Sequence, residues 1–106
     1  MRHAVIIALV ILGCASSQAA RASDWHYCLA ASHDQKTIYF SEIFESDAAL
    51  EILRGSFSEV AKRQSTDITG VQCPRAGNRN DMKKAVEAMI AYQRARMATT
   101  IKLRWP

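Results

Sequence analysis

Groups that could bind a metal gather near the start of the chain, just after its apolar N-terminus. His26 and Cys28 alternate along one expected strand, and Asp24, His33 and Asp34 are near them in sequence. Imidazole, thiolate and carboxylate groups hold zinc or copper when they converge. However, the chain has no C-x2-C or H-E-x-x-H spacing, and Cys28 is expected in a disulfide. We therefore predict no metal and no other cofactor, and we keep a periplasmic metal-handling protein as an alternative.

Residue types that act in catalysis are present, but their spacing does not favour an enzyme. No serine lies in a G-x-S-x-G sequence, and no histidine is spaced to act as its base. Glu42 and Glu45 form a pair of acids of the kind used in acid–base catalysis, but acids beside the start of a helix are common on protein surfaces. Such a small domain also has little room for a cleft. We therefore predict a non-enzymatic protein.

The N-terminal segment has the features of a cleavable secretory signal. Arg2 supplies a positive charge, residues 4–12 have no polar or charged side chain, and small residues follow. Two alanines in the A-x-A arrangement that signal peptidase accepts lie just before the expected cleavage after Ala22, with cleavage after Ala19 as the alternative. The sequence therefore predicts export.

Two alternatives to a cleaved signal are weighed against it. The apolar run is about half of the ~20 residues that a membrane-spanning helix needs, which disfavours a retained anchor. The segment Ile11 to Cys14 loosely resembles a bacterial lipobox, so a lipid anchor at Cys14 is the second alternative. We assign residues 1–22 to a signal peptide and residues 23–106 to a single small domain. The mature chain is expected to be periplasmic or secreted, with no transmembrane segment.

Cys28 and Cys73 are the two cysteines of the mature chain. In an oxidising compartment an even number of cysteines indicates disulfides, and two cysteines allow a single intrachain pairing. Closing a loop of this length stabilises the fold by about 4 kcal/mol through the entropy of the denatured state. That is a large share of the ~5 kcal/mol expected of so small a domain. We predict a Cys28–Cys73 disulfide, with two buried free thiols as the alternative.

Charge is distributed unevenly along the mature chain. Residues 23–74 contain eight acidic and four basic side chains, whereas residues 75–106 contain eight basic and two acidic ones. Such a division indicates either charge complementarity between the two parts, which we favour, or a basic surface for an anionic partner.

The polarity pattern of residues 23–106 alternates between strand and helix periods. Two segments have apolar residues at helical spacing, with Ser46 and Asn80 as their expected caps. Met82, Met89 and Met97 lie on the apolar stripe of the second helix, so we expect them in the core rather than in a copper-binding series. The expected elements are strands 25–31 and 37–41, helix 47–63, strand 67–73, helix 81–97 and strand 100–105.

This ββαβαβ order predicts an α+β domain. Two amphipathic helices each need a partner surface, and a four-stranded sheet supplies it. The simplest arrangement is a two-layer sandwich with both helices on one face of the sheet.

The alternation of side chains along the strands gives a candidate binding surface. If the cystine faces the core, the aromatic residues of the first strand lie on the opposite face, where basic residues of the last strand can join them. Such an open face suits recognition of a protein or a polyanion. In the alternative, which we favour, the aromatic residues are core. The candidate residues are Trp25, Tyr27, Tyr39, Lys102 and Arg104.

These observations lead to one principal hypothesis and one alternative of a different class. The principal hypothesis is an exported protein-interaction module with an unknown protein partner, either an inhibitor or a host-directed effector. It would bind through the sheet face or the basic C-terminal part of the chain. The alternative is a protein that binds a polyanion, either nucleic acid or acidic polysaccharide, whose affinity would fall steeply with added salt.

Overall fold

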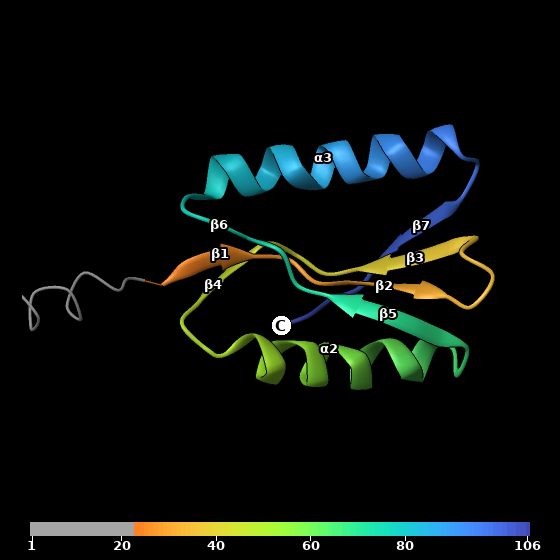
Figure 1. The fold of residues 1–106 in the computed structure, drawn as a ribbon, viewed down its shortest axis with the longest axis horizontal. Coiled ribbons are helices and arrows are strands. Elements are labelled where there is room, and N and C mark those ends of the chain that lie inside the picture. Colours follow the sequence, from red (N-terminus) through yellow and green to blue (C-terminus); the bar gives the residue numbers. More distant parts are fainter. Residues whose placement is uncertain (1–22) are drawn as a thin grey trace, which may run out of the picture.

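The computed structural model describes residues 23–106, and its two helices and seven strands confirm the α+β class (Figure 1). The predicted signal peptide, including the alternative anchor at Cys14, lies outside the described residues. No helix within residues 23–106 is long and apolar enough to span a membrane. The elements are β1 (Asp24–His26), β2 (Leu29–Ser32), β3 (Thr37–Phe40), β4 (Phe44–Ser46), α2 (Leu50–Gln64), β5 (Ile68–Gln72), β6 (Arg75–Ala76), α3 (Arg79–Ala95) and β7 (Thr99–Lys102).

The strands form two sheets. The larger is four-stranded, with the order β5-β2-β3-β7, and β7 runs parallel to β3 while the other neighbours are antiparallel. The smaller has the order β4-β1-β6. The predicted first strand is divided at Tyr27 and Cys28, so β1 and β2 belong to different sheets. The sequence missed β4 and β6 because strands of three and two residues are too short to show a period.

The two helices lie on opposite faces of the sheets, so the prediction that both cover one face is wrong (Figure 1). The reason is the alternation of side chains between β1 and β2. Cys28 and Ala30 pack in one core with α2, whereas Tyr27 and Leu29 pack in a second core with α3. Because both faces of this segment are apolar, each face needs its own helix.

The first predicted helix is present as α2, but its predicted cap is wrong. Buried residues recur every four positions along it, and the fully buried Phe57 is at their centre. The helix begins after Ala49, which makes no side-chain cap. The hydroxyl of Ser46 instead accepts a hydrogen bond from the backbone N–H of Ala48 at 3.0 Å, and so orders the turn before the helix.

The second predicted helix is present as α3, and it begins at Arg79, two residues before the predicted start at residue 81. Oδ1 of Asn78 accepts the N–H of Asp81 at 2.8 Å, and Nδ2 of Asn78 donates to the carboxylate of Asp81 at 3.1 Å. The bond from the Asp81 N–H caps the helix, and Asn80 lies inside it. Met82 is buried as predicted, but Met97 follows the helix with a φ of 64° and is 91% exposed. Met97 is therefore not a core residue.

Candidate binding surface

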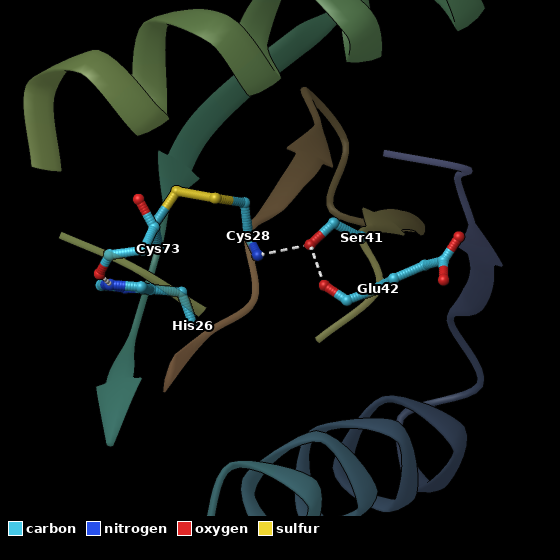
Figure 2. The surroundings of a disulfide bond; sticks show 6 residues. His26, Cys28, Ser41, Glu42 and Cys73 are labelled. Atoms are coloured by element: carbon cyan, nitrogen blue, oxygen red, sulfur yellow. Dashed lines mark hydrogen bonds between the residues drawn. A yellow bond between two sulfur atoms is a disulfide. The ribbon is translucent and has the colours of Figure 1, made fainter. Parts of the chain in front are cut away.

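The predicted disulfide between Cys28 and Cys73 is present, in the core beneath α2 (Figure 2). It joins the junction of β1 and β2 to the end of β5, and its Cα atoms are 4.0 Å apart. The backbone N–H of Cys28 donates to Oγ of Ser41 at 2.8 Å, and that hydroxyl donates to the carbonyl of Glu42, also at 2.8 Å. Since both sulfur atoms are bonded to each other, neither cysteine offers a thiolate to a metal.

His26 lies in the core beside the cystine (Figure 2). Its Nε2 is 3.3 Å from the carbonyl oxygen of Ser46, which can only accept, so Nε2 donates there. Its ring stacks on Phe44 with the ring centroids 5.6 Å apart, and its Nδ1 is buried without a hydrogen-bond partner among the described residues. Within residues 23–106, no three His, Cys, Asp or Glu side chains converge as a metal site would require.

The turn after β2 is organised by Asp34. Its Oδ1 accepts the hydroxyl of Ser32 at 2.7 Å and the backbone N–H of Lys36 at 3.0 Å. These hydrogen bonds, that of Ser32 first, hold the pKa of the Asp34 carboxyl below its usual range. His33 is exposed in the same turn, and its backbone N–H donates to the carbonyl of Asp67. The acid and the imidazole are thus parts of a turn and do not converge on a ligand.

The structure does not bring the five predicted surface residues together on one exposed face. Tyr27 is 4% exposed in the α3 core, and burial raises the pKa of its phenol. Tyr39 is 9% exposed in the α2 core, on the opposite face of the sheet. Trp25 is half-buried against the α3 core. The aromatic residues are therefore core residues, which leaves Lys102 and Arg104 as the exposed members of the set.

Lys102 and Arg104 border a shallow hollow of about 300 Å³ beside the end of β7. Leu103, which is buried, and the exposed Glu42 also line it. Two backbone hydrogen bonds hold this segment in place: Leu103 N–H donates to the carbonyl of Phe40 at 2.7 Å, and Glu42 N–H donates to the carbonyl of Trp105 at 3.2 Å. The hollow is open to solvent and carries more positive than negative charge.

Seven of the eight basic residues of the C-terminal part, all except Arg75, belong to one layer of the molecule. α3 lies on one side of the sheets, and the register pairs Lys102 with Phe40, which packs in the α3 core. Side chains of paired residues lie on the same face, so Lys102 is on the α3 side. We call this set the basic layer; it comprises Arg79, Lys83, Lys84, Arg94, Arg96, Lys102 and Arg104, all of them exposed.

No residue of the basic layer pairs with a carboxylate of the described chain. Among residues 23–106, one ion pair is found within 4 Å, between Arg75 and Asp24 at 3.6 Å. Arg96 instead donates to the carbonyl of Gln35 at 3.1 Å and lies over the ring of the exposed Tyr92. The sequence favours charge complementarity between the acidic and basic parts of the chain. Within residues 23–106, direct pairing between these parts amounts to this one contact.

The position of β7 at the edge of the sheet is a feature that sequence analysis missed. Alternation of Ile101 with Thr100 and Lys102 predicts a strand, but nothing in this pattern gives its neighbours. The structure places β7 beside β3 alone, at one end of the four-stranded sheet. The edge strand, the hollow and the basic layer therefore meet at Lys102.

Comparison of the chain with family models, with curated proteins and with solved structures finds no match in any of the three.

Proposed function

We propose that the mature domain is a non-enzymatic, exported protein-interaction module that binds an acidic protein through its basic layer. The observation that carries this proposal is the absence of carboxylate partners for the basic layer within residues 23–106. Positive surface charges without negative partners create a positive potential, which attracts an acidic partner and speeds its association. Such a surface favours binding over a merely structural role for these residues.

Two further features support this class of function. The hollow beside Lys102 is shallow and open to solvent, which suits contact with a macromolecule better than enclosure of a small substrate. The cystine and the signal-like N-terminal sequence both fit an oxidising compartment outside the cytosol. The proposal therefore combines export with a charged contact surface.

Comparison of two charge-reversal variants tests the proposal. Lys102→Glu/Arg104→Glu changes the basic layer, and Arg54→Glu/Lys62→Glu makes the same charge change at exposed positions of α2. The exported protein and both variants are used to capture partners from the envelope and culture medium of the source organism, and direct affinities are then measured with the purified partner. We expect a partner whose affinity falls at least about tenfold with the first variant and not with the second.

Two results would overturn the proposal. One is a partner whose affinity is the same for both variants, since binding would then not depend on the basic layer. The other is retention of nucleic acid or heparin in place of a protein, with an affinity that falls steeply as salt is added, which would favour a polyanion-binding protein.

A further inference from the structure

β7 is an edge strand with one side of its backbone directed away from the sheet. The N–H of Thr99 donates to the carbonyl of Lys36 at 2.8 Å, and the N–H of Leu103 donates to the carbonyl of Phe40 at 2.7 Å. In a parallel pair, alternate residues of a strand bond to the same neighbour. Positions 99, 101 and 103 therefore bond to β3, and Thr100 and Lys102 direct their N–H and C=O groups toward the open edge.

The other edge of this sheet, β5, is less suited to pairing with a further strand. Gly70 in β5 has a φ of 65°, and the pairing of β5 with β2 shifts register between Leu29 and Ala31. Such irregularities twist an edge and protect it from pairing. In β7, by contrast, all four residues pair with β3 in unbroken register, and three of the four are exposed. β7 is thus the regular edge.

We infer that β7 accepts an extended acidic segment of the protein partner as an additional strand, an inference that rests on the proposed function. Backbone hydrogen bonds to Thr100 and Lys102 would supply the pairing. The side chains of Lys102 and Arg104, two positions apart, lie on one face, where acidic residues two positions apart in the added strand can meet them. Ile101, 38% exposed on the other face, suits an apolar residue adjacent to those acids in the added strand.

Charge distinguishes this occupant from a second copy of the chain. Pairing of two β7 strands would bring Lys102 and Arg104 of one copy near those of the other, and like charges across a sheet are destabilising. Glu42 is the acid in the hollow, so the end of the added segment nearest Glu42 would not be acidic. The expected ligand is therefore a short strand with alternating acidic and apolar residues and a neutral end.

The test uses a synthetic fluorescent peptide, Thr-Glu-Val-Glu-Val-Glu-Thr, and the same peptide N-methylated at both its glutamates and its valines, so that the donors on both of its edges are removed. N-methylation leaves the side chains and charge unchanged but removes backbone donors. Binding to the exported protein is followed by fluorescence anisotropy. If the peptide adds as a strand, we expect the unmodified peptide to bind and the methylated one to bind at least about tenfold more weakly.

A matched pair of proline variants tests the same point on the protein. Thr100→Pro removes an N–H that faces the open edge, where proline is tolerated in a strand. Thr66→Pro is the same substitution in the exposed segment between α2 and β5, after a residue with the extended backbone that proline requires. Thermal unfolding confirms that each variant is folded. We expect Thr100→Pro to lose peptide binding and Thr66→Pro to keep it.

The outcomes separate strand addition from the proposed function. If Thr100→Pro and the methylated peptide bind as tightly as the originals while Lys102→Glu/Arg104→Glu still loses the protein partner, strand addition is overturned and the proposed function stands. Strand addition is likewise overturned if the unmodified peptide fails to bind while Lys102→Glu/Arg104→Glu still loses the protein partner. If the charge reversal affects neither peptide nor partner, both ideas fail.

Discussion

At the scale of single residues, the hydroxyl of Ser41 supports the polypeptide at the cystine. Ser41 is almost fully buried, and its Oγ accepts the N–H of Cys28 while its own N–H donates to the carbonyl of Cys28. The segment between β1 and β2 therefore depends on a side chain where a regular strand would use backbone groups. A buried N–H without a partner is destabilising, so this hydroxyl matters more than its size indicates.

Replacing Ser41 with alanine tests this role. Ser41→Ala leaves the buried N–H of Cys28 without its acceptor, so we expect the free energy of unfolding to fall by about 1–3 kcal/mol. Ser56→Ala, at an exposed position of α2, is the control and should change it by less than about 0.5 kcal/mol. Urea denaturation of the oxidised protein measures both. Equal effects of the two variants would show that the hydroxyl has no special role.

At the scale of elements, α2 contains a glycine that its packing does not require. Gly55 is exposed in the helix interior, and a Cβ added there would meet no atom within 4 Å. Glycine is a poor helix former because its backbone loses more conformational freedom on folding than that of other residues.

Gly55→Ala is therefore expected to raise the free energy of unfolding by about 0.5–1 kcal/mol. The matched control is Gly70→Ala in β5, which should lower it, because Gly70 has a positive φ that alanine adopts with strain. Thermal or urea unfolding of both variants gives the comparison. Destabilisation by Gly55→Ala would mean that another group packs against Gly55 too closely to admit a methyl group, a contact that the structure does not contain.

The sequence predicted elements better than it predicted their arrangement. Periodicity located both helices and the longer strands, because each has enough residues to repeat a pattern. It did not place the helices on opposite faces, because both sides of the segment from residue 27 to 30 are apolar. Tyr27 and Leu29 lie on one side, and Cys28 and Ala30 lie on the other. Alternation alone cannot show that both sides are covered.

The candidate site was predictable only in part. Charge alone identifies Lys102 and Arg104 as surface residues, and they are exposed. Aromatic character alone does not distinguish a surface residue from a core residue, and Tyr27 and Tyr39 are each buried beneath a different helix. The open edge of β7 depends on strand order, which follows from pairing between distant segments and has no local signal.

At the scale of the whole molecule, the proposals depend on export to an oxidising compartment. The cystine closes a loop between positions 45 residues apart, and its stabilisation of about 4 kcal/mol is comparable with the total expected of so small a domain. In a reducing compartment the domain would lack this bond and be marginally stable. After export, the basic layer would encounter partners outside the cytosol.

Intact-mass spectrometry of the protein isolated from its source organism under non-reducing conditions tests this claim most directly. We expect a chain that begins at Ser23 and is lighter by two hydrogens than the reduced form. Addition of dithiothreitol should restore the mass of the reduced form. A chain that still begins at Met1, with the thiols of Cys28 and Cys73 free to react with an alkylating reagent, would contradict it.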